Sequence, residues 1–97
     1  MNCLAPVADI QAKTAAFCQV PLRVIKNYER SESAVTARQV AAYLAHELTG
    51  QGPYKLSHRF NRDHSTIRYS IAKVRERCEA DPEFAADIEA LRERLAA

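Results

Sequence analysis

The sequence predicts a small all-α domain of about five to six helices that contains a helix-turn-helix. Its 97 residues suit one domain with a single modest core. Apolar residues recur at spacings of three and four along several segments, as they do on the buried face of a helix. Two such segments, at about 53–60 and 64–79, are separated only by a short polar turn. We therefore expect residues 1–97 to form one domain, with the helix-turn-helix at about 53–79.

The residue pattern of the N-terminal part predicts two helices followed by a loop. Residues 1–5 are expected to fray, and a first helix is expected to end near Cys18, because apolar positions repeat at Val7, Ile10, Thr14 and Phe17. Pro21 begins a short second helix in which Leu22 and Ile25 are expected to face inward. The polar residues 26–34 lack helical periodicity and predict a loop.

A third helix is expected from an N-cap at Thr36 to Gly50, where glycine favours a helix end. Its inward positions are Ala37, Val40, Ala41, Leu44 and Leu48. Tyr43 is assigned to the core and His46 to the solvent. In this interpretation Arg38 lies in the first turn, where the helix dipole favours an acid, so a phosphate contact explains it better than helix stability.

The helix-turn-helix begins at Pro53, since proline suits the first helical position. Leu56 and Phe60 form an apolar pair one turn apart, and Asn61 can adopt the left-handed angles that a tight turn at 61–62 requires. The next helix has one buried stripe, formed by Ile67, Ile71, Val74 and Cys78. Its opposite face and its first turn are then free to bind another molecule.

That first turn carries side chains suited to a DNA major groove. Asp63 is expected to cap the helix by accepting from the backbone N–H groups of Ser65 and Thr66. Arginine can donate two hydrogen bonds to one guanine, aspartate accepts from the cytosine amino group, and hydroxyl groups suit either edge of a base pair. A solvated, well-capped surface helix is the alternative. The candidate DNA contacts are Arg38, Pro53, Tyr54, Lys55, Arg62, Asp63, His64, Ser65, Thr66, Arg68 and Lys73.

The run Arg62-Asp63-His64-Ser65-Thr66-Ile67, after Phe60-Asn61 and with Arg38-Gln39 and Glu47-Leu48-Thr49 upstream, resembles the C-terminal DNA-binding domain of the bacterial replication initiator DnaA. The resemblance implies a Trp-repressor-like helical fold that binds double-stranded DNA. It also implies that Pro53, Tyr54 and Lys55 lie near the DNA backbone. The family's strongly basic loop is depleted here, because Glu29 and Glu32 dilute Arg30.

Charge is distributed unevenly along the chain. Residues 51–75 contain six Lys or Arg and one acid, whereas residues 76–97 contain three and seven. The positive charge therefore coincides with the helix-turn-helix, as expected of a nucleic-acid binder. The acidic last helix is expected to start after an Asp81 N-cap and to lie away from DNA. This helix carries an apolar stripe formed by Phe84, Ile88, Leu91 and Leu95. The stripe is expected to pack against the recognition helix; the alternative is that it is exposed and pairs with a second copy of the chain.

Several functional classes are disfavoured. The three cysteines and three histidines show no metal-ligand spacing, no apolar run could span a membrane, and no Gly-x-x-x-x-Gly-Lys-[Ser/Thr] phosphate loop is present. We expect a cytoplasmic protein, more readily monomeric than dimeric, with no cofactor, no bound nucleotide and no enzymatic activity. The leading hypothesis is sequence-specific binding of double-stranded DNA by a transcription or replication regulator. The alternative is a protein-binding adaptor that kept the fold and lost strong DNA binding.

Overall fold

The computed structural model describes residues 6–96, and the expectation of a frayed segment at 1–5 lies outside them. No strand occurs among the described residues, which confirms the predicted all-α class. The elements are α1 (Val7–Phe17), the 3-10 helix η1 (Leu22–Ile25), α2 (Glu32–Thr49), α3 (Pro53–Phe60), α4 (His64–Ala80) and α5 (Pro82–Ala96).

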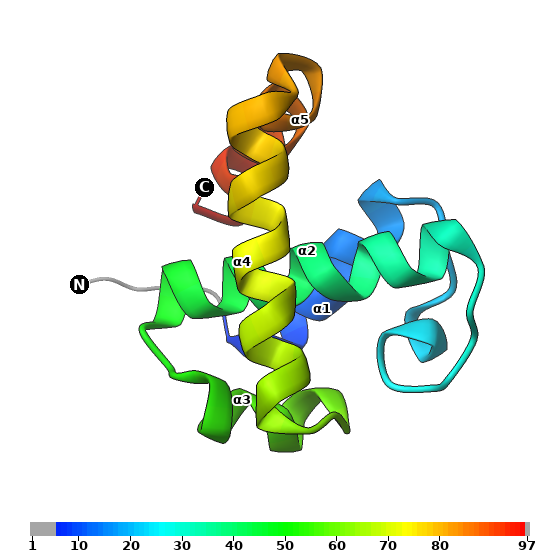
Figure 1. The fold of residues 1–97 in the computed structure, drawn as a ribbon. Coiled ribbons are helices and arrows are strands. Elements are labelled where there is room, and N and C mark those ends of the chain that lie inside the picture. The colour runs from blue at the N-terminus through cyan, green and yellow to red at the C-terminus, as the bar shows by residue number, and fades with distance from the viewer. Residues whose placement is uncertain (1–5, 97) are drawn as a thin grey trace.

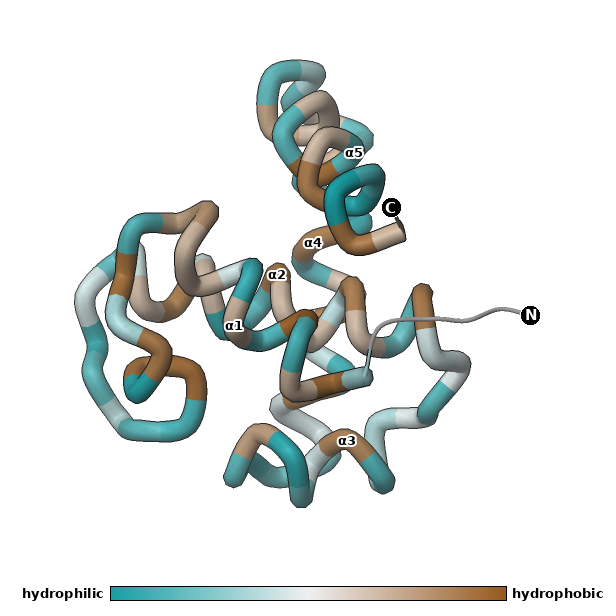
Figure 2. The backbone as a smooth tube through the Cα atoms, turned by 180° about the vertical axis from the view of Figure 1, so that it is seen from behind, coloured by the Kyte–Doolittle hydropathy of each residue, from teal (hydrophilic) through white to brown (hydrophobic). Residues whose placement is uncertain are grey.

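Helix α2 forms the centre of the domain. It packs most extensively against α4 on one side and α1 on the other, and the two opposite views place it between them (Figures 1 and 2). Residues 40–45 are all buried. Three of these six positions are alanine, and their small side chains allow the neighbouring helices to approach closely.

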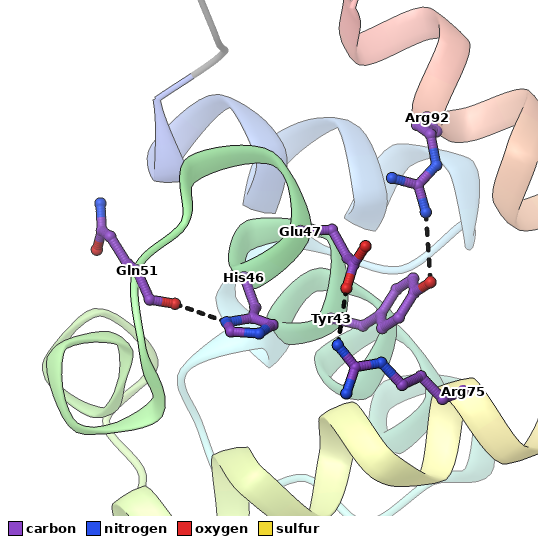
Figure 3. Close-up of polar contacts among 6 residues, drawn as sticks. All are labelled: Tyr43, His46, Glu47, Gln51, Arg75 and Arg92. Atoms are coloured by element: carbon purple, nitrogen blue, oxygen red, sulfur yellow. Dashed lines mark hydrogen bonds and ion pairs between the residues drawn. The ribbon is translucent and has the colours of Figure 1, made fainter.

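Polar side chains join α2 to the helices around it (Figure 3). Arg75 on α4 pairs with Glu47 at 2.9 Å, and Arg92 on α5 donates to the hydroxyl of Tyr43 at 3.3 Å. The ring of Tyr43 is buried, as predicted, because this bond satisfies its hydroxyl group at the edge of the core.

The ends of α4 pack against different helices. Helix α3 packs against its first part and α5 against its last part, so α3 and the acidic α5 lie at opposite ends of the molecule (Figure 1). Asp81 caps α5 by accepting from the N–H groups of Glu83 and Phe84 at 3.1 and 3.2 Å. The expected stripes of α4 and α5 are buried in one common core, with Cys78 partly buried beside them.

Three local expectations are wrong. Helix α2 begins at Glu32, because Ser31, not Thr36, is the N-cap and accepts from the N–H of Ala34 at 3.3 Å. In η1 Leu22 is exposed, whereas Val24 and Ile25 are buried. His46 is half-buried, and its Nδ1 donates to the carbonyl of Gln51 at 2.8 Å (Figure 3). The end of α2 is as predicted, with Gly50 at a φ of 75°.

Candidate nucleic-acid interface

Helix α3 presents its first residues to solvent. Pro53 occupies the first turn, and Gly52 before it provides no side-chain cap. Leu56 and Phe60 are buried as predicted, which leaves Tyr54 and Lys55 exposed on the opposite face. The first N–H groups of this helix therefore have no side-chain acceptor in the part of the chain that the structure describes.

The turn between α3 and α4 depends on Asn61. This residue has left-handed backbone angles, with φ of 54° and ψ of 44°, as the sequence predicted. The N–H of Asn61 and that of Arg62 both donate to the carbonyl of Ser57, and the second of these bonds is 3.1 Å long. A turn of this kind fixes the angle at which α4 leaves α3.

Asp63 is the N-cap of α4. Its carboxylate accepts from the N–H of Ser65 at 3.0 Å and also from the Ser65 hydroxyl. The expected bond from the Thr66 N–H goes instead to the backbone carbonyl of Asp63, at 3.0 Å. The side-chain and then the backbone hydrogen bond from Ser65 lower the pKa of Asp63 below its ordinary value. The cap is therefore an anion in neutral solution.

The face of α4 opposite its buried stripe carries a row of exposed polar residues. Ser65 and Thr66 lie in the first turn, Arg68 in the second, and all three are exposed. Lys73 is also exposed and pairs with Glu76 at 3.5 Å. Tyr69 is 59% exposed on the same face, although it is not among the candidate DNA contacts named from the sequence. An aromatic residue three positions after Thr66 was the available signal, because that spacing places both on one helix face.

Aromatic rings gather where α3 meets α4. The ring of Tyr54 lies 5.8 Å from the rings of both His58 and His64. These residues line an open cleft of about 560 Å³ whose wall also includes Tyr28, from the loop before α2. Tyr28 is 71% exposed, and no sequence pattern indicated its proximity to the helix-turn-helix.

The guanidinium groups of Arg62 and Arg38 donate hydrogen bonds to backbone carbonyls of the protein itself. The Arg62 guanidinium donates to the carbonyls of Lys26 and Asn27, and Arg38 donates to those of Val24 and Glu29. Burial, followed by the nearby charge of Arg62, lowers the pKa of Arg38. Arg38 lies in the second turn of α2, not the first, because the helix starts earlier than predicted. Both arginines line a smaller cleft that also contains Thr66 and Tyr69.

Residues 6–96 contain neither a metal-binding cluster nor a membrane-spanning helix. No three His, Cys, Asp or Glu side chains converge there as a metal-binding group. None of the described helices combines the length and the apolar character that crossing a membrane requires.

Comparison with known proteins agrees with this geometry. The family profile described as the bacterial dnaA protein helix-turn-helix matches residues 7–74. The chain belongs to this DnaA helix-turn-helix family. The Streptococcus thermophilus chromosomal replication initiator protein DnaA is 33% identical over 93 residues, and the Streptococcus pyogenes serotype M5 protein of the same name is 33% identical over 91.

The match covers nearly all of this chain but a small part of these DnaA proteins. It spans 95% and 93% of the chain, and 20% of each relative. The family profile itself covers the DnaA helix-turn-helix, a DNA-binding domain, and corresponds to α1 through most of α4. Helix α5 lies beyond the span of the family match, which ends at residue 74.

Proposed function

We propose that this domain binds double-stranded DNA at specific sequences, with the first turns of α4 in the major groove. The observation that supports this most directly is the division of α4 into two faces. Ile67, Ile71 and Val74 hold one face in the core, while Ser65, Thr66 and their polar neighbours stay exposed on the other. A recognition helix needs this arrangement, because it must be rigid and still reach base edges.

Base discrimination is assigned to the first two turns of α4. Thr66 offers a hydroxyl and a methyl group, Arg68 offers an exposed guanidinium, and Asp63 retains acceptor positions beyond those that Ser65 uses. His64 and Ser65 lie beside them and complete this group. Thr66→Ala is expected to change discrimination at its base pair by roughly 1–3 kcal/mol.

Affinity is assigned to phosphate contacts around this group. Lys55 and Tyr54 are exposed at the start of α3, where Pro53 and the following N–H groups face solvent without a side-chain cap. Lys73 adds a cation further along α4. Arg38 would contribute its remaining N–H groups, since two are used on the carbonyls of Val24 in η1 and Glu29 in the loop. These contacts are independent of base sequence and provide most of the binding energy.

The proposed action is occupancy of a DNA site. The 97 residues contain no Gly-x-x-x-x-Gly-Lys-[Ser/Thr] loop, so no ATP hydrolysis by that route is assigned to them. A monomer that occupies its site on the nucleoid could regulate a promoter or a replication element without a motor. The acidic α5 lies at the end of α4 away from the recognition turn, where it does not repel the phosphates (Figure 1).

Selection of binding sites from random duplex DNA, followed by fluorescence anisotropy at two salt concentrations, tests this function. We expect an enriched sequence and an affinity that falls steeply with salt. Thr66→Ala should change the preferred sequence, whereas Glu83→Ala on α5 is the matched control that should not. Absence of binding in dilute salt would contradict the proposal. The low basic charge of this segment, where Glu29 and Glu32 dilute Arg30, would then favour the protein-binding adaptor.

A further inference from the structure

The loop between η1 and α2 is attached to the helix-turn-helix by Arg62. This side chain donates through Nη1 to the carbonyl of Lys26 at 3.3 Å and through Nη2 to that of Asn27. Its guanidinium also lies over the ring of Tyr28, 4.8 Å from the centroid. Asn61 adds a bond from its side-chain amide to the carbonyl of Lys26 at 3.4 Å. Residues 35 positions apart are thereby joined.

Arg38 also donates to this loop, and to η1 before it. Its Nη1 donates to the carbonyl of Val24 at 2.9 Å, and its Nη2 donates to that of Glu29. The segment is mostly hydrophilic (Figure 2) and supplies no residue beyond Ile25 to the core before Ala34. Its position therefore depends on two guanidinium groups, because little apolar burial is available to fix it.

The bonds of Arg62 leave it poorly suited to read a base. A bidentate contact with guanine uses two N–H groups on one edge of the guanidinium, and both terminal nitrogens already donate to carbonyls. Direct readout would require these bonds to break and the Tyr28 contact to separate. Only an arginine can supply this fork and stack on a ring at once; lysine provides a point charge instead.

We propose that Arg62 is a positioning residue that fixes the loop 26–30 against the start of α4, so that loop and recognition helix meet DNA as one surface. The loop carries the cations Lys26 and Arg30, and Tyr28 lines the same open cleft as Tyr54 and His64. The effect of Arg62 on DNA affinity passes through this loop. This inference rests on the proposed function only for its effect on DNA.

Hydrogen exchange of the free protein tests the attachment without DNA. In Arg62→Ala and in Arg62→Lys, the amides of residues 26–30 are expected to exchange about tenfold faster, while those of the α2 core around Leu44 keep their protection. Arg68→Ala is the matched control, since it removes an exposed cation from the same helix end and should leave loop exchange unchanged. Unchanged loop exchange in both Arg62 variants would overturn the proposal.

A double-mutant cycle tests the consequence for DNA. Arg62 bonds to the backbone carbonyl of Lys26, which the Lys26→Ala variant keeps, so we expect coupling between Arg62→Ala and Lys26→Ala in DNA affinity to report the position of the loop. We expect the double variant to lose less affinity than the two single losses combined predict. Additive losses, with the Arg62→Ala defect confined to one base pair, would identify a base-reading arginine and overturn the proposal. If the unaltered protein ignored DNA, the exchange result would stand and only the proposed function would fail.

Discussion

The side-chain amide of Gln11 on α1 donates to the backbone carbonyl of Arg59 at 2.8 Å and so ties the first helix to the last turn of α3. Gln11 is buried, and within residues 6–96 this is the one acceptor of its side-chain amide. A carbonyl in the last turn of a helix lacks an intrahelical donor, so this bond satisfies a group that the helix cannot. The helix-turn-helix is therefore fastened to the N-terminal helix by a polar contact as well as by the core.

Replacing Gln11 with leucine should destabilise the domain. The Arg59 carbonyl would lose its donor in a part-buried setting, which costs about 1–3 kcal/mol at most. Urea unfolding followed by circular dichroism measures this loss. Lys13→Ala, on an exposed position of the same helix, serves as the control and should leave the midpoint nearly unchanged. Equal midpoints for the two variants would show that the bond contributes nothing.

Asn61→Val should destabilise the turn, and Asn61→Gly should be tolerated. Left-handed angles at a φ of 54° lower the free energy of unfolding by roughly 1–2 kcal/mol for a β-branched residue, whereas glycine adopts them freely. Thermal unfolding of both variants provides the comparison. The same ranking is expected for DNA affinity, because the turn sets the direction of α4. A valine variant as stable as the glycine variant would rule out the left-handed conformation as the reason for asparagine here.

The cap at Asp63 should make stability depend on pH. Because the folded pKa is below the ordinary value, the charged cap stabilises the fold fully above that ordinary pKa and loses this contribution as the pH falls through the folded one. Asp63→Asn keeps a capping oxygen but cannot titrate. The advantage of the unaltered protein over this variant should therefore shrink on acidification in urea titrations at several pH values. A constant difference at every pH would argue against the anionic cap.

Lys55→Ala should weaken binding to specific and random DNA alike. A phosphate contact carries no sequence information, so its loss should lower the slope of affinity against salt by about one unit. Anisotropy titrations at several salt concentrations give the slope. Lys13→Ala removes a charge from α1 and serves as the control. Should Lys55→Ala instead change sequence preference, this lysine would belong to the base-reading group.

Local features of the fold could be predicted because each depends on residues within one helical turn. The apolar spacing of α4, the proline that starts α3, the glycine that ends α2 and the asparagine of the turn all act through their own backbone or their nearest neighbours. The start of α2 could not be chosen in this way. Ser31 and Thr36 are both good caps, and the burial of Ala34 in the core favours the earlier one.

The sequence alone determined the all-α class, the helix-turn-helix and the polar face of its second helix, since periodicity and capping are read within a few residues. Only the tertiary structure decided what Arg62 and Arg38 bind. Their carbonyl partners lie up to 36 and 14 positions away, and a guanidinium bonds to whichever acceptors the packed chain brings near it. Packing likewise placed Tyr28 beside the recognition helix. Residue types and spacing specify a surface able to meet DNA, but the fold determines which of its cations are free to do so.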